Sequence, residues 1–426
     1  MAERLALRAG TLIDGRSSTV RTDVLVVSEN DRIVSVTDYS QASVPPNAIF
    51  VDASSYTVIP GLIDAHVHIL GSGEPGEDNF FTSGAEVSIP SLTLQCYRNA
   101  LKSLDAGWTT LRDVASRHYA DVEVRNAINR GDLIGPRLWV SGLGITSTAG
   151  HMDYDKFLAP HLPPYFVSAV ADGPTEARRA VRQNLRFDVD LIKFNATLTE
   201  HVRRYRGYCA PEMTEETMAA LIEEAHWHGR KVTTHCYGGD GATWAIRSGV
   251  DSIEHGFYLT DDHLRMMADM GTVLCPTLSV PGRFRQHGKE ALGAMGNVEL
   301  LDAWRQKATK AAWDTVRRAR KLGVTIICGD DAAMPFVRHG SNAFELEMLV
   351  EAGLSPMEAL QSATSVAAAA IAFEDVGAVE AGKFMDLVVV QGNPLDDICI
   401  LQNLENIPLV IKGGTVVADR REKLYA

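Results

Sequence analysis

The sequence predicts an α/β protein: a (β/α)8 barrel, or TIM barrel, with a small β-sandwich domain formed by both chain termini. Between residues 59 and 378, eight short apolar runs alternate with helix-like segments, a pattern typical of repeated β-α units. At both ends of the chain, short β-type runs are separated by turn residues instead. We therefore expect residues 1–58 and 379–426 to form the β-sandwich and residues 59–378 to form the barrel.

The two terminal sets of strands are expected to combine, because a four-stranded fragment with an open edge is only marginally stable alone. Lys412-Gly-Gly is the predicted turn between the last two strands. The predicted terminal strands are 5–9, 23–27, 32–36, 48–51, 386–390, 409–411 and 415–418.

The barrel region begins with the run 58–70, which we interpret as a buried strand. A doubly wound open sheet is the alternative, but no glycine fingerprint follows this first strand. Thr214 is a predicted helix cap, and Ser355-Pro-Met-Glu358 is a capping box with proline at the first helical position. The predicted strands are 58–70, 109–114, 137–141, 191–195, 231–235, 252–255, 272–276 and 325–329, and the predicted helices are 92–106, 120–130, 175–187, 214–228, 241–248, 261–270 and 300–322.

Composition excludes several classes of partner. The chain has 41 basic and 54 acidic residues and a net charge of -13, which argues against nucleic acid as the main partner. Its six cysteines lie far apart without a Cys-x-x-Cys pair, so neither a disulfide framework nor a thiolate zinc site is indicated. No apolar run has the length of a secretory or membrane-spanning segment. We expect a cytoplasmic protein without a membrane partner.

Polar residues that suit a metal site recur at the ends of the predicted barrel strands. Each has an ordinary explanation alone: a lysine at a strand edge, histidines in a core, an aspartate that caps a helix. Their joint occurrence at strand ends that face one another in a barrel indicates a common site. These residues are His66, His68, Lys193, His235, His255, Asp330 and Asp331.

The residue types favour two divalent ions, most simply zinc. Imidazole and carboxylate ligands suit zinc, and four histidines exceed what one tetrahedral zinc with an open position needs. Lys193 does not fit as an ammonium ion, which would repel the metals. Burial beside cations lowers a lysine pKa, and a neutral amine adds carbon dioxide to give a carbamate that bridges two metals. We therefore hypothesise a carbamate on Lys193.

The chain resembles the amidohydrolase superfamily and, within it, the dinuclear prolidase-like branch that includes ochratoxin-hydrolysing amidases. Nearly the whole length carries this resemblance: Pro-Gly-Leu-Ile-Asp-Ala-His-Val-His at 60–68, Gly-Trp-Thr-Thr-Leu-Arg-Asp at 107–113, Ile-Lys at 192–193, Thr-His at 234–235, Glu-His-Gly at 254–256 and Gly-Asp-Asp-Ala at 329–332. The segments 339–347 and 353–360 are also similar to this branch.

The resemblance implies a ligand set. His66, His68, carbamylated Lys193 and Asp331 would hold one ion, and Lys193, His235 and His255 the other. The family usually has Gly-Thr-Asp on the last strand, whereas this chain has Gly329-Asp330-Asp331. We align Asp331 with the family aspartate, although either acid remains open at this point. Strand alternation allows only one of them to face the axis. We also expect a homo-oligomer.

A dinuclear site of this kind implies hydrolysis of an amide bond. A metal-bridging hydroxide would be the nucleophile, and Asp331 would take its proton and pass it to the leaving amine. His151 and Tyr237 are candidate catalytic and substrate-binding residues, as donors to the scissile carbonyl. Each can also be read as an ordinary loop or packing residue. His339 is a further candidate for substrate binding.

The expected substrate carries a free carboxylate. Two zinc ions against a carbamate, an aspartate and a hydroxide leave a charge of about +1, which suits an N-acyl amino acid or dipeptide. We predict a carboxypeptidase- or dipeptidase-like enzyme whose substrates include ochratoxin A, cleaved to release phenylalanine. The segments 69–91, 143–174 and 279–299 are expected to be loops over the site that set specificity.

Three alternatives differ from this prediction. A deaminase-type enzyme with one metal would lack the lysine and would have a glutamate where this chain has Gly238. A cyclic-amide hydrolase or imidazolonepropionase-like enzyme would share the fold and differ mainly in its loops. A non-catalytic binding barrel is the remote alternative, since such proteins lose metal ligands and every ligand position is filled here.

Overall fold

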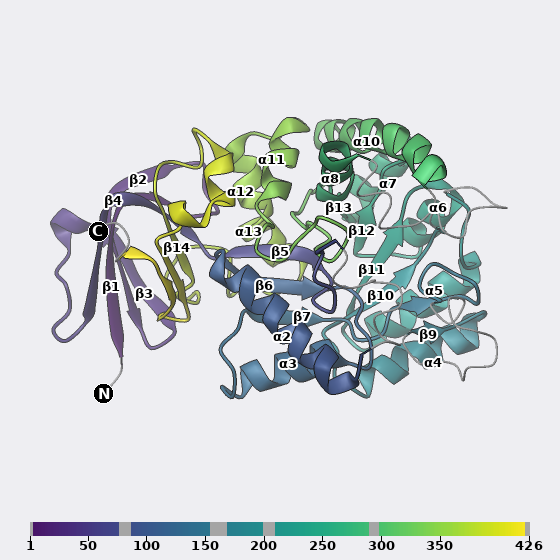
Figure 1. The fold of residues 1–426 in the computed structure, drawn as a ribbon, viewed down its shortest axis with the longest axis horizontal. Coiled ribbons are helices and arrows are strands. Elements are labelled where there is room, and N and C mark those ends of the chain that lie inside the picture. Colours follow the sequence, from purple (N-terminus) through teal and green to yellow (C-terminus); the bar gives the residue numbers. More distant parts are fainter. Residues whose placement is uncertain (1–2, 76–86, 154–167, 199–208, 289–297, 422–426) are drawn as a thin grey trace.

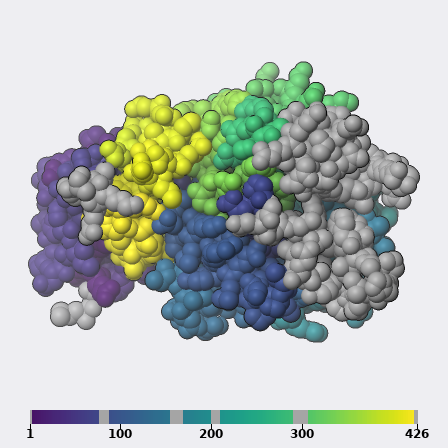
Figure 2. Space-filling model, in the orientation of Figure 1, coloured from purple at the N-terminus to yellow at the C-terminus, as the bar shows by residue number. Residues whose placement is uncertain are grey.

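The structure is a computed structural model that describes residues 3–75, 87–153, 168–198, 209–288 and 298–421, with side chains omitted for 298–305. A sheet built from both ends of the chain lies at one side, and strands surrounded by helices make up the rest (Figure 1). On the face shown in Figure 2, the carboxyl-terminal segment (yellow) lies between the amino-terminal strands (purple) and the remainder of the molecule.

Both termini contribute to one seven-stranded sheet, in the order β16-β15-β14-β4-β1-β2-β3. This agrees with the inference that the two ends combine. β4 joins them, because it pairs in parallel with β1 on one side and antiparallel with β14 on the other. Leu7, Val26 and Leu387 share one hydrophobic cluster. The strands of this sheet are β1 (Arg4–Ile13), β2 (Val20–Glu29), β3 (Arg32–Asp38), β4 (Ile49–Pro60), β14 (Leu387–Val390), β15 (Leu409–Lys412) and β16 (Thr415–Asp419).

The predicted strand 58–70 is divided between two sheets. β4 ends at Pro60 in the terminal sheet, and β5 (Leu62–Val67) begins after Gly61. A Cβ atom on Gly61 would lie 2.1 Å from the Thr109 hydroxyl oxygen, so a side chain there would clash with the neighbouring strand. This glycine therefore allows one apolar run to serve both parts of the molecule.

Among the described residues, the strands outside the terminal sheet pair in parallel. They form a six-stranded sheet, in the order β13-β12-β11-β10-β8-β9, and a three-stranded sheet, in the order β5-β6-β7. The short strands β8 and β9 were not predicted. The bounds are β5 (Leu62–Val67), β6 (Trp108–Asp113), β7 (Arg137–Val140), β8 (Ile145–Thr146), β9 (Ala169–Val170), β10 (Leu191–Asn195), β11 (Lys231–Cys236), β12 (Ser252–His255) and β13 (Val273–Cys275).

The predicted eighth strand, 325–329, is not a regular strand. Ile326 forms an isolated parallel bridge with Leu274 of β13, and the Ala65 N–H of β5 donates to the Cys328 carbonyl at 2.9 Å. These bonds link the edges of the two parallel sheets. The segment then turns sharply, because Asp331 and Ala333 have φ values of +61° and +100°, which a regular strand does not permit.

Helices follow the strands and lie outside them (Figure 1). Two predicted caps are confirmed: the Thr214 side chain accepts from the Thr217 N–H, and Ser355 and Glu358 form a reciprocal capping box. The helices are α2 (Ile89–Asp105), α3 (Ala120–Asn129), α4 (Pro174–Leu185), α5 (Glu215–Trp227), α6 (Gly239–Arg247), α7 (Asp261–Met270), α8 (Ser279–His287), α10 (Val298–Lys321), α11 (Phe344–Glu351), α12 (Pro356–Ser362) and α13 (Ser365–Ala370), with 3-10 helices η1 (Tyr39–Gln41), η4 (Ile398–Gln402) and η5 (Leu404–Asn406).

Two expectations drawn from composition can be compared with the fold. Four of the six cysteines are buried and all are free, whereas Cys209 is partly exposed and Cys399 is exposed. Within the described ranges, no helix combines the length and apolarity needed to cross a membrane.

Candidate active site

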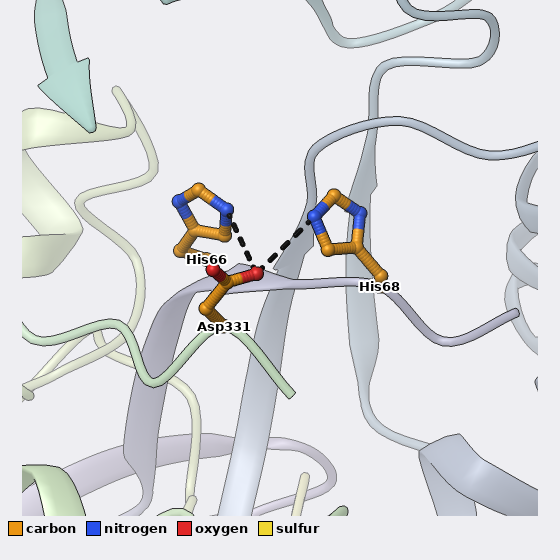
Figure 3. Close-up of side chains that lie close together, drawn as sticks. All are labelled: His66, His68 and Asp331. Atoms are coloured by element: carbon orange, nitrogen blue, oxygen red, sulfur yellow. Dashed lines mark ion pairs between the residues drawn. The ribbon is translucent and has the colours of Figure 1, made fainter. Parts of the chain in front are cut away.

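Three predicted metal ligands meet at the carboxyl end of β5 (Figure 3). His66 lies in β5 and His68 directly follows it, so both side chains project in the same direction. The Asp331 Oδ1 atom lies 3.5 Å from His66 Nε2 and 3.3 Å from His68 Nε2. All three side chains are buried.

Asp331, and not Asp330, is the acid beside the histidines. The Asp330 Oδ1 atom accepts a hydrogen bond from the Ala332 N–H at 2.8 Å, and the Asp330 N–H donates to Asp64. Burial and the neighbouring Asp64 raise the pKa of Asp330 well above its ordinary value. Burial also acts to raise the pKa of Asp331, but His66 and His68 outweigh it and lower this pKa well below its ordinary value.

Glu254 of β12 holds the other nitrogen of His66. Its Oε2 atom lies 2.6 Å from His66 Nδ1, while its Oε1 atom accepts from Arg112 at 2.8 Å, from Ser252 at 2.6 Å and from Thr233. Burial acts to raise the pKa of Glu254, but Arg112 and His66 lower it well below its ordinary value. Glu254 therefore accepts the Nδ1 proton of His66 and leaves Nε2 directed toward Asp331.

Sequence reasoning did not assign roles to Glu254 and Arg112. The available signal was a charged residue inside an otherwise apolar strand, which is rarely buried unless it is paired. Both residues lay within motifs that carried the family resemblance, at 254–256 and 107–113.

Lys193, His235 and His255 come from the consecutive strands β10, β11 and β12. The rings of His235 and His255 have centroids 4.6 Å apart, and those of His66 and His255 lie 5.2 Å apart. The His255 Nδ1 atom is 2.7 Å from the Thr277 hydroxyl and 4.0 Å from Asp331 Oδ2. Burial lowers the pKa of Lys193 to about 8, which increases the share of neutral amine at neutral pH.

His235 has no hydrogen-bond partner on either ring nitrogen among the described residues, although it is buried. An unpaired buried polar atom costs about 1–3 kcal/mol. Its pKa is lowered well below the ordinary value, first by burial and then by the positive charge of His255 and Lys193. A neutral imidazole with free nitrogens is the form that binds a metal ion.

Two of the three remaining predicted residues contact His235, and the third lies beneath the loop that follows β5. His151 stacks on His235, with ring centroids 4.2 Å apart and an interplanar angle of 22°. Tyr237 meets His235 edge-on at 4.7 Å. The His339 Nε2 atom lies 3.1–3.2 Å from the carbonyl oxygens of His68 and Gly71, so His339 supports the loop that follows β5. Its ring is buried, and burial lowers its pKa to about 4.

The donor set fits a divalent metal. The ligand atoms of His66, His68 and Asp331 lie within 4.8 Å of one another. A second group of similar spacing joins His66 with Glu254 and Cys275, but the Glu254 oxygens are already engaged and burial raises the pKa of the Cys275 thiol well above its ordinary value. A protonated thiol is a poor ligand, so the group that contains Asp331 suits a metal better.

Comparison with known proteins identifies the family of this chain. The family model described as "Amidohydrolase family" matches residues 57–417. The chain belongs to the amidohydrolase family. Among curated relatives of this amidohydrolase, ochratoxinase from Aspergillus niger is 30% identical over 427 residues, which cover 95% of this chain and 85% of the relative. Imidazolonepropionase from Streptomyces coelicolor is 27% identical over 388 residues, or 86% of this chain and 85% of the relative.

Solved structures agree with the sequence relatives. The crystal structure of a Xaa-Pro dipeptidase with methionine bound in its active site has a TM-score of 0.86 and 31% identity, and covers 98% of this chain and 100% of that one. The structure of A. niger ochratoxinase has a TM-score of 0.84 and 28% identity, and covers 98% and 96%. The structural neighbours of this amidohydrolase therefore include a Xaa-Pro dipeptidase and an ochratoxinase.

One expectation about the loops of the amidohydrolase is wrong. The segment 279–299, predicted as a loop, contains α8. Phe284 is fully buried in the core, and Arg285 forms an ion pair with Glu351 at 2.5 Å, so this part of the segment packs against α11. Residues 154–167 of the predicted loop 143–174 lie outside the described residues.

Proposed function

We propose that this amidohydrolase is a zinc-dependent, carboxypeptidase- or dipeptidase-like enzyme that cleaves the amide bond to a C-terminal amino acid. Its substrates would be N-acyl amino acids, dipeptides or ochratoxin A, from which it would release phenylalanine. The observation that carries the proposal is the buried His66–His68–Asp331 cluster beside His235, whose ring nitrogens lack partners within the described chain. Similarity to an ochratoxinase and to a Xaa-Pro dipeptidase supports the substrate class.

The residues present would hold two divalent ions. His66, His68 and Asp331 would bind one, and His235 and His255 the other, with a carbamate formed from Lys193 and carbon dioxide between them. The depressed pKa of Lys193, about 8, supports carbamate formation because only the neutral amine adds carbon dioxide. Bound divalent ions lower the pKa of coordinated water and polarise a carbonyl. We also infer that the parallel strands close into a single barrel and that the terminal sheet packs as a β-sandwich.

The side chains of this protein would move and direct protons. Asp331, whose pKa is held low by the histidines, would accept a proton from water and deliver it to the leaving amine nitrogen. Glu254 would keep the Nδ1 proton on His66. His151 and Tyr237 flank His235, where they would contact the scissile carbonyl. His339 would act through the loop that carries His68.

The proposal is tested with matched pairs of substrates. A screen of N-acyl amino acids, dipeptides and ochratoxin A reads which amino acid is released. Conversion of the free carboxylate to a neutral amide is expected to lower kcat/KM by roughly 10- to 100-fold, because a charge-assisted hydrogen bond contributes about 1.5–3 kcal/mol. Equal rates on the acid and the amide would exclude the carboxypeptidase-like activity.

A cyclic-amide hydrolase or imidazolonepropionase-like activity is the second candidate, favoured by the 27% identity to an imidazolonepropionase. Ring opening of cyclic amides without turnover of any acyl amino acid would select it. The cytoplasmic location, the homo-oligomeric state and the division of the chain at residues 58 and 378 stay predictions.

A further inference from the structure

A cavity lies outside the candidate active site. It has a volume of about 560 Å³ and is formed by the start of α2, the turn before α3, the segment after β7, and α4. None of the proposed metal ligands lines it. Its volume lies within the range of small-molecule sites in proteins, roughly 300–1,000 Å³.

The charges of this cavity are positive and largely uncompensated. Arg179, Arg182 and Arg186 line it from α4 and its C-terminal cap, and their spacing of three and four residues places them on one face of the helix. Arg182 pairs with Glu224. In the described part of the chain, neither Arg179 nor Arg186 has an ion-pair partner, and the cavity lining includes no carboxylate.

This cluster is unusual in a chain with a net charge of -13. Arg178, on the same helix but outside the cavity, bonds to Glu223 and Glu224. Among the described residues, carboxylates therefore pair with Arg178 and Arg182 of α4 but with neither Arg179 nor Arg186. Like charges held close together repel one another, and a bound anion relieves that repulsion.

The cavity is also lined by aromatic residues, and part of its backbone is strained. The rings of Tyr119 and Phe187 stack with centroids 3.7 Å apart and an interplanar angle of 17°, and Phe187 is 41% exposed. His118 and Tyr119 are consecutive non-glycine residues with φ values of +53° and +57°. Strained backbone of this kind is concentrated at functional sites, where the surrounding structure retains it.

We propose that this cavity binds a small organic anion, with its phosphate or carboxylate group held by Arg179 and Arg186 and a flat apolar group against Tyr119 and Phe187. A guanidinium group matches the oxygens of either anion with two parallel hydrogen bonds. The proposal is independent of the proposed hydrolysis, since the cavity and the metal ligands share no residue.

Isothermal titration calorimetry of the full-length protein with phenyl phosphate and with benzoate tests this site. We expect saturable binding of one of these anions by the unmodified chain and at least a tenfold weaker Kd in the double variant Arg179→Gln/Arg186→Gln. Arg247→Gln is the matched control, because Arg247 is an exposed arginine at the end of α6 outside the cavity. The Arg247→Gln variant should bind the anion with the same Kd as the unmodified chain. Thermal unfolding of each variant shows whether it is folded.

The absence of saturable binding of either anion to the unmodified chain would overturn the proposal. Equal affinity in the double variant would also overturn it, because the ligand would then bind elsewhere, for example at the metal centre. Phe187→Ala separates an organic anion from free phosphate. This variant should bind phenyl phosphate more weakly, and its affinity for inorganic phosphate should be unchanged. Equal affinity of the unmodified chain for inorganic phosphate and phenyl phosphate would overturn the assignment to an organic anion.

Discussion

His66 and His235 belong to the same buried cluster, but the protein holds them in different ways. On the β5 side, His66 Nδ1 bonds to Glu254, which itself accepts hydrogen bonds from Arg112, Ser252 and Thr233. On the β11 side, neither nitrogen of His235 has a partner among the described residues. Its ring contacts the rings of His151, Tyr237 and His255.

The β5 half of the site is therefore already organised by hydrogen bonds. The β11 half lacks them at His235, within the described chain, and requires a bound ion to satisfy this histidine. A histidine whose second nitrogen is hydrogen-bonded has a fixed tautomer and ring orientation, which raises metal affinity. A buried histidine without such a bond carries a desolvation cost until an ion binds it. We therefore expect the affinity for the ion on the β5 side to depend on the hydrogen bonds that orient its ligands. The affinity for the ion on the β11 side should depend mainly on the ligands that bind it directly. The variants below test this comparison.

The largest effect is expected for Asp331→Asn, since Asp331 contacts both sides of the cluster. Loss of its proton-transfer role should lower kcat by about 100- to 10,000-fold, measured on the best substrate from the screen. Asp330→Asn is the matched control and should be milder, because Asp330 bonds to Ala332 and Asp64 and not to the histidines. The reverse ranking would show that Asp330 is the catalytic acid.

Lys193→Ala should lose most activity and part of the bound metal, because the proposed carbamate belongs to both halves. Metal content by mass spectrometry and activity with added acetate or formate measure this, and short carboxylates should restore some turnover. Lys231→Ala is the control, as Lys231 lies at the exposed start of β11 and pairs with Asp251. Unchanged metal content together with no rescue would contradict a bridging carbamate.

Glu254→Gln should lower the affinity for the first ion by about 10- to 100-fold, which is typical when the partner of a ligating histidine is removed. Competition with a metal chelator measures this affinity independently of turnover. Glu224→Gln serves as the control, since its side chain is also buried and bonded to Arg178 and Arg182 but lies outside the cluster. If Glu254→Gln leaves the metal affinity unchanged, the hydrogen bonds on the β5 side do not distinguish this half of the site from the other.

The smallest effect is expected for Thr277→Val, which removes the bond to His255 Nδ1. A single neutral hydrogen bond contributes about 0.5–1.5 kcal/mol, so the affinity for the second ion should fall by roughly 2- to 12-fold. The same chelator competition measures it. A loss as large as that in Glu254→Gln would mean that both halves are equally preformed.

Local patterns were sufficient for much of the fold. Capping at Ser355 and Thr214 follows from contacts within four residues, and the positions of β10, β11 and β12 follow from apolar runs bounded by turns. The segments 279–299 and 325–329 were mispredicted because packing decided them. Phe284 is buried in the core, and Ile326 contacts the neighbouring strand through an isolated bridge.

Histidines and acids at the ends of successive strands could be predicted from local patterns, because strand period and apolar patterning are encoded in adjacent residues. The orientation of Asp331 toward the histidines depends on the folded chain, through a left-handed turn at φ +61°. The bond between Glu254 and His66, which are 188 residues apart in the chain, depends on it as well. Such contacts depend on how distant strands align, and the local pattern around either residue does not specify that alignment.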